Sequence, residues 1–149
     1  VWRHREKDVI PFCISKGIKV IAYSFFAQGI LLKKSIDRGS PIFSSARKNL
    51  VFFQKDNEEI TAEIVRQLVS LSIENNLPVL NILFGWAAEK KWLTGIVAGA
   101  SGKNQFMEII EAADSAPDTK INKKLDNISV LAENINDTGN IFAHRISDN

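Results

Sequence analysis

The chain has 149 residues, a formal net charge of +2 at pH 7 and a hydrophobic fraction of 45%. This length suits a single domain with a substantial core, and the dispersed Lys and Arg argue against nucleic-acid binding. No apolar run approaches the roughly 18 residues that a membrane-spanning helix needs. The charged N-terminal residues are not those of a signal peptide, so we expect a cytoplasmic protein without a membrane partner.

The sulfur and imidazole groups give no indication of a reactive or metal site. Cys13 is the single cysteine, which excludes an intramolecular disulfide. It lies among apolar residues, and we interpret it as a buried thiol rather than a nucleophile. His4 and His144 lie near opposite ends of the chain without ligand spacing. We therefore predict no metal site.

The first third of the chain predicts a helix, a strand and a long connection. Apolar residues repeat at helical spacing over residues 5–16, and Gly17 is a typical C-terminal stop. Residues 18–23, IKVIAY, are nearly all apolar, which favours a buried parallel strand. Residues 24–53 form a connection with Gly, Pro and many Ser. Connections of this length are usually functional or mobile.

The remainder predicts four helices and a second strand. A helix begins after Asn57, which suits an N-cap, and a second begins at Pro78. Residues 95–98 form a short apolar strand that ends in Gly-Ala-Ser-Gly. The next helix carries apolar residues at Phe106, Ile109, Ile110 and Ala113. The last carries them at Ile121, Leu125, Ile128, Ala132 and Ile135.

Two apolar strands separated by helices predict parallel pairing through a right-handed crossover, which is an α/β architecture. Two strands do not make an independent sheet, because their edges and one face would stay uncovered. We expect the missing partner strands to come from more of the polypeptide or from another copy.

The two predicted strands end in AYSFFAQG (22–29) and AGASGKNQ (98–105). Ligands of α/β folds bind at such carboxyl ends. In the second motif, Gly99 can adopt a positive φ and Ser101 can cap the next helix. The free N–H groups of that helix, together with Lys103, can receive an anion. A plain capped turn with a solvated lysine remains the alternative.

These two motifs together resemble the C-terminal part of the aldo-keto reductases, including the related potassium-channel β subunits. The resemblance runs from about Trp2 to about Leu125. It implies a (β/α)8 barrel that binds NADP(H), with residues 18–23 as the seventh strand and 95–98 as the eighth. This chain would be the C-terminal part of that barrel, incomplete as it stands.

The resemblance also implies the cofactor contacts. Lining the nicotinamide ribose and diphosphate would be Tyr23, Ser24, Phe25, Phe26, Ala27, Gln28 and Gly29. Lys34 and Arg47 would fold over the cofactor. Holding the adenosine end and its 2′-phosphate would be Gly99, Ser101, Lys103, Gln105 and Glu108.

The sequence departs from the family pattern in three ways. Ser24-Phe25-Phe26 replaces the usual Ser-Pro-Leu, and Ile109 replaces an Asn that meets adenine. The family's catalytic Asp, Tyr, Lys and His lie on earlier strands, and none of them is in this chain. We therefore assign no catalytic residue here.

On this interpretation residues 1–149 are one partial domain. Its parts are a helix before strand seven (1–17), strand seven and the cofactor loop (18–57), helices (58–93), strand eight with its cofactor-binding turn and helix (94–114), and a final helix and tail (115–149). The complete protein would reduce aldehydes or ketones by hydride transfer from NADPH. The alternatives are a non-catalytic nucleotide-sensing or interaction module, like a channel β subunit, and a truncated fragment without activity.

Overall fold

The computed structural model describes residues 3–33, 50–116 and 118–135. The helices and strands are α1 (Val9–Ser15), β1 (Val20–Tyr23), α2 (Glu58–Asn75), α3 (Val79–Ala88), β2 (Leu93–Val97), α4 (Lys103–Ala113) and α5 (Thr119–Leu131). Short 3₁₀ turns are η1 (His4–Glu6), η2 (Ala27–Leu32), η4 (Val51–Phe53), η5 (Lys55–Asn57) and η6 (Ala132–Asn134). The predicted α/β class is confirmed, although the first helix begins at Val9 rather than at residue 5.

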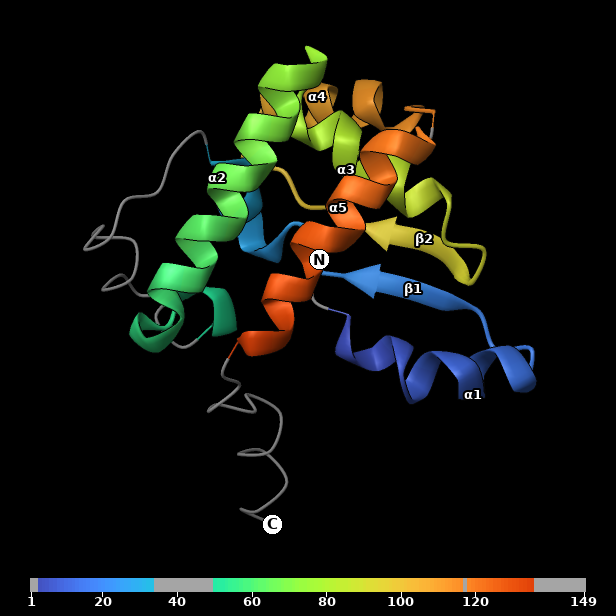
Figure 1. Ribbon diagram of the computed structural model, residues 1–149. Coiled ribbons are helices and arrows are strands. Elements are labelled where there is room, and N and C mark those ends of the chain that lie inside the picture. The colour runs from blue at the N-terminus through green and yellow to red at the C-terminus, as the bar shows by residue number, and fades with distance from the viewer. Residues whose placement is uncertain (1–2, 34–49, 117, 136–149) are drawn as a thin grey trace.

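β1 and β2 form a parallel pair, as the sequence predicts (Figure 1). Their register aligns Ile21 with Gly95 and Tyr23 with Val97, and it shifts between Val20 and Ile21. Within the described residues the sheet has two strands. Both strands therefore end at the same edge.

The strands are not buried, and that part of the prediction is wrong. Ile21 is 61% exposed, Tyr23 78% and Val97 53%. Alternate side chains of a strand point to opposite faces, and here the face that carries these three is uncovered. Parallel strands with such apolar runs are normally covered on both faces, and the described residues cover only one.

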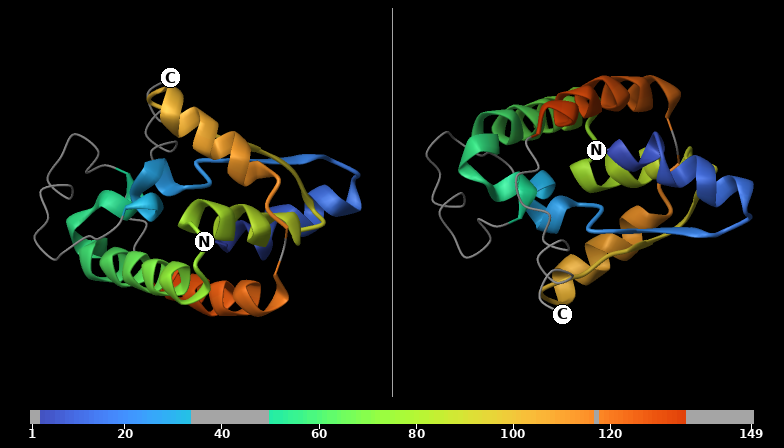
Figure 2. Two further views of the ribbon diagram at one scale, coloured as in Figure 1. Left: turned by 90° about the horizontal axis from the view of Figure 1, so that it is seen from above. Right: turned by 90° about the horizontal axis from the view of Figure 1, so that it is seen from below.

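The core lies among the helices instead. α2 and α5 run side by side, and α3 lies between this pair and the strands (Figure 2). Ile64 and Leu68 of α2, Leu83 of α3 and Leu125 of α5 are each 0% exposed. The five apolar positions predicted for the last helix are all buried: Ile121, Leu125, Ile128, Ala132 and Ile135. Amphipathic spacing therefore predicts the helical core well.

The residues at the starts of α5, α2 and α3 play different roles. Asp118 accepts hydrogen bonds from the backbone N–H groups of Lys120 and Ile121 at the start of α5. Asn57 occupies the predicted N-cap position of α2, but its side-chain amide donates to the Val51 carbonyl at 2.8 Å. Asn57 thus ties α2 to η4 rather than capping the helix by accepting. Pro78 stands one residue before α3, as its N-cap.

α1 ends in the glycine stop that the sequence predicts. Gly17 has a φ of +64°, its N–H donates to the Ile14 carbonyl, and the N–H of Ile18 donates to the Cys13 carbonyl. These two bonds form a Schellman motif, in which a left-handed residue satisfies the last helical carbonyls.

Gly17→Ala is expected to lower the free energy of unfolding by about 1 kcal/mol, the cost of a left-handed conformation for a residue with Cβ. A Cβ at Gly17 meets nothing within 4 Å, so the unfavourable left-handed backbone conformation is the only source of the loss. Urea unfolding of the two proteins measures the difference. Gly102→Ala is the control, because Gly102 is extended and its Cβ also meets nothing within 4 Å. Equal losses in both variants would contradict the assignment.

Two helices expose apolar side chains that the sequence places on a buried stripe. On α1, Ile14 is 60% exposed and Ile10 is the buried residue. On α4, Phe106 is 53% and Ile110 47% exposed. The buried side of α4 carries Ala112, with Ile109 packed against the core, so the predicted stripe is only partly correct. Cys13 on α1 is half-buried rather than enclosed.

No single helix in the described ranges is long and apolar enough to cross a membrane. Residues Lys55–Asn75 and Val79–Ala88 reach that length and apolarity only as a pair, bent by 93°.

Candidate functional site

The parallel register brings the two motifs of interest to one edge of the sheet. Tyr23, the last residue of β1, is the register partner of Val97, the last residue of β2. Residues 24–29 and 98–105 therefore leave the sheet from neighbouring positions. This is the edge at which α/β folds bind ligands.

The turn after β1 is locally strained. Ser24, Ala27 and Gln28 have φ values of 54°, 47° and 52°, which are left-handed conformations that side chains with a Cβ disfavour. Gly29 adopts a φ of 86° at no such cost. The Ala27 N–H donates to the Ser24 carbonyl at 2.8 Å, and the Gln28 amide donates to the Ser24 hydroxyl at 2.6 Å. Such strain persists only where the surroundings hold it.

The side chains of this turn divide between the core and the solvent. Phe26 and Ala27 are buried, Phe25 is half-buried and Gln28 is exposed. Tyr23 is also exposed. Phe26 and Ala27 thus anchor the turn in the helical core, while Gln28 stays accessible. Lys34 and Arg47, predicted to fold over a cofactor, lie outside the described residues.

The turn after β2 differs from the sequence prediction in two details. Gly102 rather than Ser101 holds the N-cap position of α4, with an extended backbone. The Ser101 backbone N–H and hydroxyl instead donate to Gln105 Oε1, at 2.7 and 2.9 Å. Among the described glycines a positive φ occurs at Gly17 and Gly29, so the expectation for Gly99 is wrong. The turn reaches the helix through extended Gly102 and needs no left-handed residue at Gly99.

The remaining predicted residues line the start of α4. Lys103 and Glu108 are exposed, and Gln105 is half-buried. Ile109 packs against the core instead of facing solvent. The accessible groups at this turn are therefore the Ser101 hydroxyl, the Lys103 ammonium and the first N–H groups of α4. Together they are suited to an anion.

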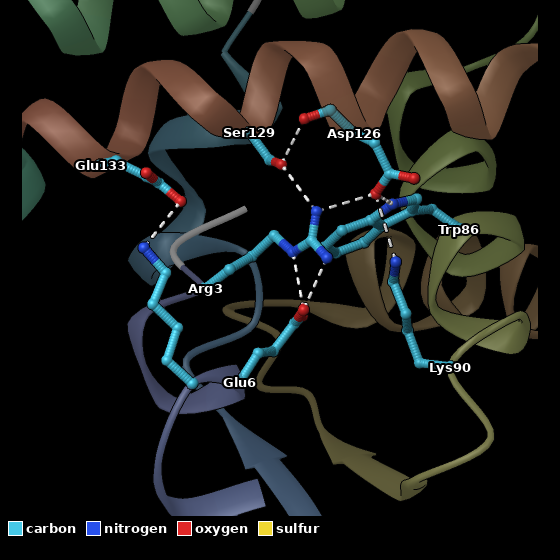
Figure 3. Close-up of polar contacts among 8 residues, drawn as sticks. Arg3, Glu6, Trp86, Lys90, Asp126, Ser129 and Glu133 are labelled. Carbon is cyan, nitrogen blue, oxygen red and sulfur yellow. Dashed lines mark hydrogen bonds and ion pairs between the residues drawn. The ribbon is translucent and has the colours of Figure 1, made fainter. Parts of the chain in front are cut away.

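A polar network lies beside the core, centred on Asp126 of α5 (Figure 3). Asp126 Oδ1 accepts from Trp86 Nε1 at 2.9 Å, from Arg3 Nη1 at 3.1 Å and from Lys90 Nζ at 3.2 Å. Arg3 also bonds Glu6 through Nε and Nη2, at 2.8 and 2.6 Å. The network joins η1, α3 and α5.

Sequence reasoning missed this network. The Lys90 ammonium lies 4.4 Å from the centre of the Trp86 ring, although Lys90 follows the end of α3 at Ala88. A spacing of four residues hints at this pair. Nothing in the sequence indicates that Asp126 joins it, because α5 meets α3 only through tertiary packing.

The network shifts the protonation of Asp126. Partial burial raises the pKa of this carboxyl. Hydrogen bonds from Trp86 and Lys90 and the charges of Lys90 and Arg3 lower it by more in total, so the pKa lies below the usual 3.8. Because the folded-state pKa lies below the unfolded one, the ionised carboxylate stabilises the folded protein above about pH 4. The stabilisation is lost as the pH falls through the folded-state pKa.

We therefore expect Asp126→Asn to lower the free energy of unfolding near neutral pH, and this effect to fade as the pH drops below about 4 and through the lowered folded-state pKa of Asp126. Urea unfolding of the variant and the unsubstituted protein across this range measures it. Asn127→Asp, on the exposed side of the same helix, is the control for adding a carboxylate outside the network. A stability difference between the unsubstituted protein and the Asp126→Asn variant that is constant with pH would contradict the expectation.

Comparison with known proteins agrees with the resemblance seen in the two strand-end motifs. The family model described as "Aldo/keto reductase family" matches residues 1–130. The chain belongs to the aldo-keto reductase family. Members of this family are barrel proteins of (β/α)8 type that use nicotinamide cofactors, which is the expectation that the motifs raised.

The matches to curated relatives cover most of this chain but only a small part of each relative's length. The NADH-specific methylglyoxal reductase of Escherichia coli K12 is 29% identical over 110 residues, which are 74% of this chain and 33% of that protein. An aldo-keto reductase of Fusarium vanettenii is 22% identical over 112 residues, 75% of this chain and 30% of its own length. Aldo-keto reductase AFTS1 of Alternaria alternata is 24% identical over 115 residues, which are 77% of this chain and 29% of that protein. The matched region thus spans about a third of each relative.

Proposed function

We propose that this chain is the dinucleotide-binding C-terminal portion of an aldo-keto reductase barrel, with β1 as its seventh strand and β2 as its eighth. The observation that carries the proposal is the register of Tyr23 with Val97, which brings both polar turns to one edge of the sheet. A cofactor with two phosphates and two riboses requires contacts from more than one loop. In this proposal the two adjacent strand ends provide these contacts.

The turn after β1 is proposed to receive the nicotinamide ribose and the diphosphate. Ser24 and Gln28 present a hydroxyl and an amide that already bond each other at 2.6 Å. Their neighbours Phe26 and Ala27 are buried, so they position the backbone of the turn rather than contact a ligand with their side chains. In this proposal Lys34 and Arg47 close over the same region.

The start of α4 is proposed to hold the adenosine end. The helix N-terminus and the Lys103 ammonium attract a phosphate, while Ser101 and Gln105 supply hydrogen-bonding groups. Lys103 favours NADP(H), whose 2′-phosphate adds negative charge. Glu108, further along α4 and exposed, would also contact the adenosine end in this proposal. The Escherichia coli relative is named NADH-specific, so NADH is the necessary comparison.

In the complete protein the bound nicotinamide would supply a hydride to an aldehyde or ketone. The residues of this chain bind and orient the dinucleotide and move no proton. The remaining barrel strands and the family's catalytic Asp, Tyr, Lys and His would come from polypeptide outside these residues.

Fluorescence titration of the protein made from the complete coding sequence, called here the full-length protein, tests the proposal. NADPH should bind, and NADH should bind more weakly. Binding together with NADPH-dependent reduction of an aldehyde supports the reductase, whereas binding without turnover supports a nucleotide-sensing module. The proposal fails if neither dinucleotide binds.

A further inference from the structure

Trp86 of α3 is held in one orientation by three groups around it. It is 4% exposed, its Nε1–H donates to Asp126 Oδ1 at 2.9 Å, and the Lys90 ammonium lies 4.4 Å from its ring centre (Figure 3). The Arg3 guanidinium lies 5.9 Å from the same ring. An indole that is both hydrogen-bonded and packed has little freedom to rotate.

Trp86 also lies against the turn after β1. The Phe25 ring lies 6.2 Å from the Trp86 ring, at an interplanar angle of 34°. Phe25 also meets Phe26 edge to face at 5.3 Å, and Phe26 meets Phe84 of α3 at 5.4 Å. Side chains of α3 therefore pack against two adjacent phenylalanines of the turn.

The strained backbone of the turn requires packing contacts that hold it. Ser24, Ala27 and Gln28 are all left-handed, and each such residue is disfavoured relative to ordinary backbone. Phe25 and Phe26 lie between the strained positions. If their contacts loosened, the turn would relax towards ordinary conformations, and the Ser24 hydroxyl and Gln28 amide would lose their present arrangement.

We propose that Trp86, fixed by its hydrogen bond to Asp126, is a positioning residue that holds residues 24–29 in the conformation that receives the dinucleotide diphosphate. The inference rests on the proposed function for the role of the turn. The contacts from Asp126 through Trp86 to Phe25 are independent of it. Neither Trp86 nor Asp126 touches the cofactor in this arrangement, so both act through the turn.

The test compares three variants of the full-length protein. Asp126→Ala removes the acceptor of the indole N–H, whereas Asp126→Asn keeps an acceptor oxygen and removes the charge. Lys124→Ala is the matched control on the same helix, because it breaks an exposed ion pair with Glu74 and leaves Trp86 untouched. Two quantities are measured for each: hydrogen exchange of peptides covering residues 24–32, and the dissociation constant of NADPH.

We expect Asp126→Ala to speed exchange in residues 24–32 and to raise the dissociation constant, each by about fivefold, a typical size for coupling through packed side chains. In Asp126→Asn the exchange rate and the dissociation constant should lie close to those of the unsubstituted protein. Lys124→Ala should change neither quantity. Unchanged exchange in residues 24–32 of Asp126→Ala would overturn the inference, as would exchange that rises equally throughout the protein. Faster local exchange in a protein that never binds NADPH would support the contact and instead refute the proposed function.

Discussion

Ser101→Glu is expected to weaken NADPH binding by the full-length protein roughly 100-fold or more, because it places a carboxylate beside a phosphate. The Ser101 N–H and hydroxyl now donate to the Gln105 side chain, so the site has donors directed at an acceptor. A glutamate here would present an acceptor and a negative charge instead. Fluorescence titration with NADPH measures the loss.

Two further variants separate charge from unfolding. Ser101→Ala removes the hydroxyl but keeps the backbone N–H, so it should cost much less than Ser101→Glu. Ile73→Glu adds the same charge at a 75% exposed position of α2 and should leave binding unchanged. Affinity that survives Ser101→Glu would remove this turn from the cofactor site.

Leu125→Ala is expected to lower the free energy of unfolding of the 149-residue chain by about 2–5 kcal/mol. Leu125 is 0% exposed, and its helix α5 packs on both α2 and α3. Truncation would leave a cavity where the three helices meet. Helical circular dichroism during urea unfolding follows the change.

The control for this experiment is Ile21→Ala on β1. Ile21 is 61% exposed, so its truncation should cost within about 0.5 kcal/mol in the same chain. In the full-length protein the cost should rise, because barrel strands would cover this face. Equal costs for the two substitutions in the 149-residue chain would show that its core does not lie where the structure places it.

The helical core was largely predictable because amphipathic spacing marks the side of a helix that packs on other helices. Leu125 and Ile128 repeat at helical spacing and are buried as predicted, whereas the stripes predicted for α1 and α4 are only partly buried. The strands were predictable in position and direction but not in burial. Ile21 is apolar yet 61% exposed, so its sequence context predicts a burial that the described residues do not supply.

At the candidate site, the sequence predicted which turns come together, and the parallel register confirms that they leave one edge. It did not predict the conformation within them. Ser101 was expected to cap α4, yet Gly102 holds the N-cap position and Ser101 donates its N–H and hydroxyl to Gln105 Oε1, an arrangement that depends on side-chain geometry. The role of the Asp126 and Trp86 pair was not predictable either, because residues 40 positions apart meet only through the packing of α5 on α3.

Nuclear magnetic resonance of the full-length protein during NADPH titration tests the central claim most directly. The amide signals of residues 24–29 and of residues 99–105 should shift together and saturate at one NADPH concentration, because both turns contact the same molecule. Shifts confined to one of the two turns, or to neither, would contradict a dinucleotide site built across the ends of β1 and β2.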